Sequence, residues 1–128
     1  MTQYLTALDD RITVAVPTSW IAESIHLTRD RGLHTESWFP GMCDPHGPGT
    51  AQLLACIAPR PLLILGNDHD TEFPPASMAR VAEETAALYD RLGFADRLKY
   101  ISVDSPHGFW PPARAQLYRF LEHYLEGL

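Results

Sequence analysis

The sequence has few of the features that mark several large classes of protein. It holds two cysteines in 128 residues, so no disulfide framework is expected. Its 10 basic residues are scattered and its formal net charge is −6, which disfavours nucleic acid as a partner. No apolar run approaches the roughly 18 residues of a membrane span, and no basic amphipathic helix predicts binding at a membrane surface. The cellular compartment stays open.

The composition indicates a folded domain. Hydrophobic residues make up 45% of the chain and charged residues 20%, values that are normal for a globular protein. The length suits one domain with one core. We therefore expect residues 1–128 to form a single structural unit.

Strands and helices are expected to alternate along the chain. Apolar, β-branched runs typical of strands are residues 12–16, 61–65 and 98–103. Helical spacing or composition marks residues 2–8, 51–57, 75–92 and the segment from Pro111 to Leu125. This order predicts an α/β fold with three mainly parallel strands and flanking helices. Residues 17–50 show no clear period, which indicates either a long functional loop or a segment that lacks its structural context.

Two polar loops directly follow predicted strands, where open α/β sheets place their functional sites. The first contains Asp68 and Asp70, and the second contains His107. A carboxylate beside a histidine can hold the imidazole in one tautomer and stabilise its charged form. Asp70 is the favoured acid and Asp68 the alternative. The competing interpretation is a carboxylate at a helix start and a histidine that caps the last helix.

Several segments resemble one family of enzymes. Residues 58–66, the spacing of Asp70 and Pro74, the His107-Gly108-Phe109 turn and residues 4–12 are similar to parts of acetylxylan-esterase-like and dienelactone-hydrolase-like α/β-hydrolases. These are relatives of the prolyl oligopeptidase catalytic domain. The resemblance implies the C-terminal portion of an α/β-hydrolase domain, with Asp70 and His107 as catalytic acid and base. It implies a small-molecule ester substrate and no cofactor or metal.

The nucleophile of that family is missing from the sequence. No Gly-x-Ser-x-Gly occurs, and no serine has glycines two residues to either side. By the resemblance this motif would stand just upstream of Met1, which predicts a fragment of a serine hydrolase that is inactive in isolation. Ser105 is disfavoured as a substitute nucleophile, because it lies only two residues before His107.

Other interpretations remain open at this point. The chain could be a non-catalytic pseudo-hydrolase or a half-domain that pairs with a partner chain, and an exposed sheet edge could drive self-association. Cys43 and His46 have the spacing of two zinc ligands, but no second pair matches them, so no metal site is expected. Among the aromatic residues, Trp20, Trp38, Phe39 and Trp110 are candidates for a pocket wall or for core packing.

Overall fold

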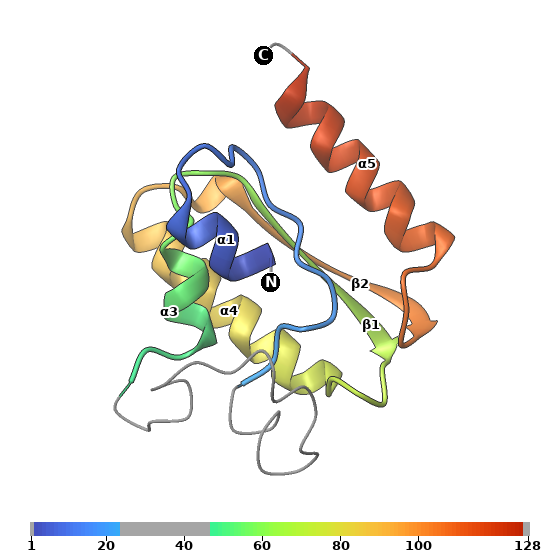
Figure 1. Cartoon of the computed structure of the whole chain (residues 1–128). Coiled ribbons are helices and arrows are strands. Elements are labelled where there is room, and N and C mark those ends of the chain that lie inside the picture. Colours follow the sequence, from blue (N-terminus) through green and yellow to red (C-terminus); the bar gives the residue numbers. More distant parts are fainter. Residues whose placement is uncertain (1, 24–46, 127–128) are drawn as a thin grey trace.

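The computed structural model describes residues 2–23 and 47–126, in which helices precede, separate and follow two strands (Figure 1). The elements are α1 Thr2–Leu8, α3 Thr50–Ala55, β1 Leu62–His69, α4 Pro75–Arg91, the 3₁₀ helix η2 Ala95–Arg97, β2 Leu98–Pro106 and α5 Pro111–Leu125. The predicted α/β class is confirmed, and both strands extend beyond the apolar runs that predicted them.

The two strands form a parallel sheet in which Leu62 lies opposite Leu98. The first predicted strand, residues 12–16, is reduced to one isolated parallel bridge, Ala15 with Leu62, and a second bridge joins Thr18, just beyond that range, with Leu65. Pro17 lies between these bridges and has no N–H to donate. Among residues 2–23 and 47–126, no further strand lies beside this segment on the side away from β1. Its backbone groups on that side therefore join no strand pairing.

Helices cover both faces of the sheet, with α3 and α4 on one side and α5 on the other (Figure 1). Leu62 and Ile64 of β1 pack into a core with buried residues of α3 and α4. Leu63 and Leu65 face the opposite way and pack with Phe120 of α5. Because alternate residues of a strand point to opposite faces, burial on both faces explains why β1 is apolar throughout its first half.

Helix α4, which follows β1, buries one stripe of residues. Its apolar and small buried positions are Met78, Val81, Ala82, Thr85 and Tyr89. Burial raises the pKa of the Tyr89 phenol, and its hydroxyl donates a hydrogen bond to the Arg60 carbonyl at 3.1 Å. The expected stripe extended to Leu92, but that side chain is 54% exposed, because the helix has already ended at Arg91.

This arrangement places polar residues together at one end of the sheet. β1 and β2 are parallel, so both of their carboxyl ends reach the same edge, and α4 and α5 begin there. None of the helices in the described ranges is both long and apolar enough to cross a membrane.

The core position of β1 predicts a specific loss of stability. Leu62 is fully buried, whereas Leu8 of α1 is 86% exposed. Leu62→Ala should lower the free energy of unfolding by about 2–5 kcal/mol through lost burial and a residual cavity. The matched Leu8→Ala variant should change it by less than about 0.5 kcal/mol. Urea unfolding followed by circular dichroism measures both, and equal losses in the two variants would contradict this packing.

Candidate active site

Asp70 is the first residue after β1, and its carboxylate is fixed by the turn that leads to α4. Its Oδ1 atom accepts hydrogen bonds from the backbone N–H groups of Glu72 and Phe73, each at 2.8 Å. The side chain has no exposed surface. A short carboxylate that bonds the backbone two and three residues ahead stabilises such a turn. One oxygen is thereby committed to the turn, and Oδ2 is left to face another group.

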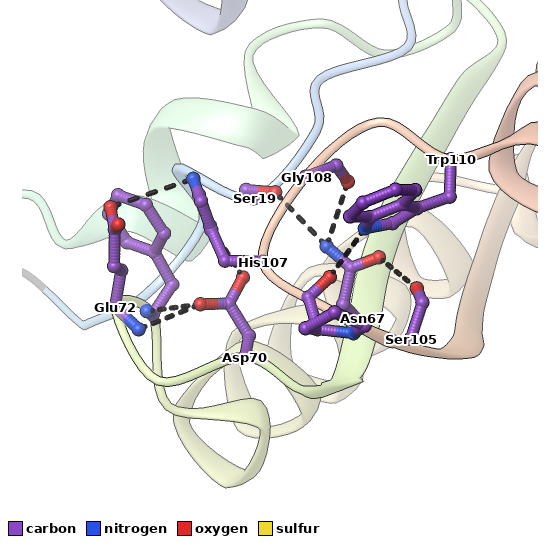
Figure 2. Close-up of polar contacts among 10 residues, drawn as sticks. Ser19, Asn67, Asp70, Glu72, Ser105, His107, Gly108 and Trp110 are labelled. Atoms are coloured by element: carbon purple, nitrogen blue, oxygen red, sulfur yellow. Dashed lines mark hydrogen bonds and ion pairs between the residues drawn. The ribbon is translucent and has the colours of Figure 1, made fainter.

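His107 is the first residue after β2, and its ring meets that second oxygen. The distance from His107 Nδ1 to Asp70 Oδ2 is 3.0 Å (Figure 2). The ring also packs against Phe73, with ring centroids 5.4 Å apart. An ionised carboxylate has no hydrogen to donate, so Nδ1 carries the proton in this contact. In the neutral ring Nε2 then has a free lone pair, which is what a general base needs.

Asp68 points elsewhere. Its carboxylate accepts a hydrogen bond from the Ser102 hydroxyl on β2, and the residue is exposed. Beside it, His69 and Asp104 form a second carboxylate–histidine pair at 2.8 Å, but both side chains are largely exposed to solvent. The prediction that Asp70 rather than Asp68 lies within hydrogen-bond reach of His107 is confirmed, and its catalytic role stays a prediction.

Glu72 is a residue of this site that the sequence pattern does not indicate. Its Oε2 atom lies 3.5 Å from His107 Nε2, on the opposite side of the ring from Asp70 (Figure 2). Its side chain is 44% exposed. The Glu72 contact is an ion pair only when the ring is doubly protonated, because the carboxylate only accepts hydrogens.

A cavity of about 340 Å³ opens beside the exposed edge of His107. Its walls combine aromatic rings and polar groups, and they include Trp20, Phe73, Phe109, Ser19, Glu72 and His107. Trp20 is therefore a wall residue, whereas the Trp110 indole lies over Gly108 and donates to the Pro106 carbonyl at 2.9 Å. Trp38 and Phe39 lie outside the described residues. A mixed lining of this kind is typical of small-molecule sites.

Ser105 is buried near this site, and its hydroxyl is engaged by Asn67. Ser105 Oγ donates to Asn67 Oδ1 at 2.8 Å. This bond gives the serine a structural partner. Ser105 does not line the cavity beside His107.

Metal ligands do not gather in the part of the chain that the structure describes. Over residues 2–23 and 47–126, no group of three or more His, Cys, Asp or Glu side chains could hold a metal ion. Cys43 and His46, the pair considered from the sequence, both lie outside those ranges.

Comparison with solved structures shows the same fold in esterases. A glucuronoyl esterase of carbohydrate esterase family 15 from Caldicellulosiruptor kristjansonii matches 99% of this chain and 40% of its own, at 19% identity and a TM-score of 0.75. A methylesterase matches 98% of this chain and 27% of its own, at 28% identity and a TM-score of 0.78. A glucuronoyl esterase from Solibacter usitatus matches 94% and 38%, at 18% identity and a TM-score of 0.76.

The chain spans between 27% and 41% of the lengths of these and similar structures. No protein-family model matches the sequence. No curated protein matches it either. The structural neighbours are α/β-hydrolase-type esterases, and this chain has the fold of a part of them.

The Glu72 contact predicts how readily His107 reacts. Glu72 Oε2 lies 3.5 Å from Nε2 and obstructs the approach of a reagent to that nitrogen. Glu72→Ala should therefore speed acylation of Nε2 by diethyl pyrocarbonate. Peptide mapping by mass spectrometry separates His107 from the other histidines.

Glu83→Ala is the matched control, since Glu83 is exposed on α4 and does not line the cavity. It should leave the rate of His107 acylation unchanged. An equal rate in Glu72→Ala and the unsubstituted chain would show that Glu72 does not contact Nε2 in solution.

Proposed function

We propose that this chain supplies the acid and the histidine of a serine-type carboxylic-ester hydrolase. Asp70 orients the ring and stabilises its charged form, and His107 acts as general base and then as general acid. The observation that carries this proposal is the 3.0 Å contact between Asp70 Oδ2 and His107 Nδ1, beside a cavity that His107 lines. Acid and histidine also follow successive strands, in the chain order that this fold uses.

The reaction requires a serine that this sequence does not offer in the family's pattern. That serine would lie on another segment, with its Oγ near Nε2 of His107. Nε2 takes the hydroxyl proton as Oγ attacks the ester carbonyl, and Asp70 stabilises the resulting imidazolium. The imidazolium then gives its proton to the leaving alcohol, which departs and leaves an acyl-enzyme. Water, activated by the same ring, hydrolyses that ester to the free acid.

The sheet has room for a strand that would carry such a serine. The backbone of Ala15, Pro17 and Ser19 bonds to β1. Alternate groups of a strand point to opposite edges, so those of Val14, Val16 and Thr18 face away from β1. Among the described residues, the backbone groups of Val14 and Val16 have no backbone partner, whereas the Thr18 carbonyl accepts a hydrogen bond from the Trp20 N–H at 2.7 Å. A parallel strand added at this edge would end on the same side as Asp70 and His107.

The neighbours and the cavity support one class of substrate. The similar structures are named glucuronoyl esterases and a methylesterase, and one glucuronoyl esterase was solved with methyl 4-O-methyl-β-D-glucopyranuronate. We therefore favour an ester of a sugar acid, in which the sugar provides the acyl group. Aromatic rings and polar side chains in one wall suit a sugar ring. The acetylxylan-esterase-like or dienelactone-hydrolase-like character suggested by sequence is the alternative within the same chemistry.

A chimera tests this function. Residues 2–126 would replace the matching part of the methylesterase, and the rest of that chain would be kept. The chimera should hydrolyse a methyl ester of glucuronic acid, and Asp70→Asn should lower kcat about 10⁴-fold, because the ring loses the partner that fixes its tautomer. The matched Asp68→Asn variant should retain activity, since Asp68 bonds Ser102 instead.

Two controls make the outcome clear. The chain alone should turn over p-nitrophenyl acetate only weakly, since it lacks both the nucleophile motif and the oxyanion-hole donor that follows the nucleophile. A folded chimera that is inactive, or equally active in Asp70→Asn and Asp68→Asn, would contradict the proposal and favour a non-catalytic binding module. Strong turnover by the chain alone, lost in His107→Ala, would reveal a nucleophile of its own.

A further inference from the structure

Asn67 is a buried polar residue near the carboxyl end of β1. It follows the apolar half of β1 and is 2% exposed. Its Oδ1 atom accepts the hydrogen bond from Ser105, and its Nδ2 atom donates to the Gly108 carbonyl at 3.1 Å (Figure 2). A buried amide without partners costs stability, so satisfied bonds are expected. Which residues provide these bonds indicates what Asn67 does.

The two partners stand on either side of His107, Ser105 at the end of β2 and Gly108 in the turn that follows. Ser105 lies two residues before His107, and Gly108 lies one residue after it. Asn67 itself stands three residues before Asp70. The strand that delivers the acid thus holds the residues around His107 at three points, once through Asp70 and twice through one amide.

The pairing of β1 with β2 is irregular next to Asn67, where the two hydrogen bonds to Ser105 and Gly108 form. Asn67 lies opposite Val103, but His69 lies opposite Pro106, so β2 has one extra residue over this stretch. Such bulges bend a strand and change the direction of its side chains. Here the bulge coincides with Ser105, whose hydroxyl meets the amide.

The same amide reaches the wall of the cavity. Its Nδ2 atom also lies 3.5 Å from Ser19 Oγ, and Ser19 lines the cavity with His107 and Gly108. Ser19 has a φ of 59°, a left-handed backbone that residues other than glycine rarely adopt. One side chain therefore connects the acid strand, the histidine turn and the cavity wall.

We infer that Asn67 is a positioning residue that holds His107 at hydrogen-bonding distance from Asp70. It acts through the Ser105 hydroxyl and the Gly108 carbonyl, and it does not itself line the cavity. The inference rests on the proposed function only for the purpose of the histidine. If Asn67 were merely part of the core, its loss would lower stability and leave the environment of the His107 ring unchanged.

The test measures the His107 ring directly in the chain as it exists. In ¹⁵N-labelled protein, the rate at which the His107 Nδ1 proton exchanges with water reports how tightly Asp70 holds it. Ser105→Ala should speed this exchange roughly threefold to tenfold, the factor expected for one net hydrogen bond. Asn67→Asp removes both N–H donors and should have a larger effect. Ser105→Thr keeps a hydroxyl and should restore slow exchange.

Ser102→Ala is the matched control. It removes a serine hydroxyl from the same strand, but that hydroxyl bonds Asp68 and not the amide. Exchange at His107 should stay as in the unsubstituted chain. Unchanged exchange in folded Ser105→Ala and Asn67→Asp would overturn the inference. If Asn67→Asp does not fold, the comparison of Ser105→Ala with Ser102→Ala decides, because Ser105→Ala keeps the amide and its other bonds.

Failure of this inference is distinct from failure of the proposed function. Ring exchange is read in a chain that needs no substrate and no nucleophile. An inactive chimera together with faster exchange in Ser105→Ala would leave Asn67 as a positioning residue and remove the esterase assignment. An active chimera with unchanged exchange would do the reverse.

Discussion

A buried carboxylate needs hydrogen-bond donors, and the Asp70 side chain finds three of them. Two are backbone N–H groups of the turn that starts α4, and the third is the His107 ring. Taking a charge out of water costs several kcal/mol unless such partners are present. The site depends on this requirement, because it fixes the turn after β1 and ties the turn after β2 to it.

The parallel sheet explains why the two turns can meet. Neighbouring parallel strands end at the same edge, so residues 37 positions apart in the chain come within hydrogen-bonding distance. Asn67 and the bulge in β2 adjust that meeting locally, and Glu72 and the cavity lie on the far side of the ring. The arrangement holds a histidine by one nitrogen and turns the other toward a place where a substrate and a nucleophile could bind.

The sequence could predict the elements that are marked by strong local patterns. The apolar run at 61–65 and the prolines at the starts of α4 and α5 led to a correct strand and correct helices, and the order of acid and histidine led to the Asp70–His107 contact. It could not show that residues 12–16 form a single bridge instead of a strand, because that depends on Pro17 and on what flanks the edge. Asn67 and Glu72 were missed because their partners are distant in the chain and no local pattern marks them.

The contact between Asp70 and His107 predicts a single tautomer of the neutral ring. The ¹⁵N chemical shifts of His107 report that tautomer directly, at a pH where the ring is neutral. Protonated Nδ1 and unprotonated Nε2 are expected, because Asp70 can only accept a hydrogen from Nδ1. A proton on Nε2, or the averaged shifts of a free histidine, would contradict the central claim that the buried carboxylate orients this ring for catalysis.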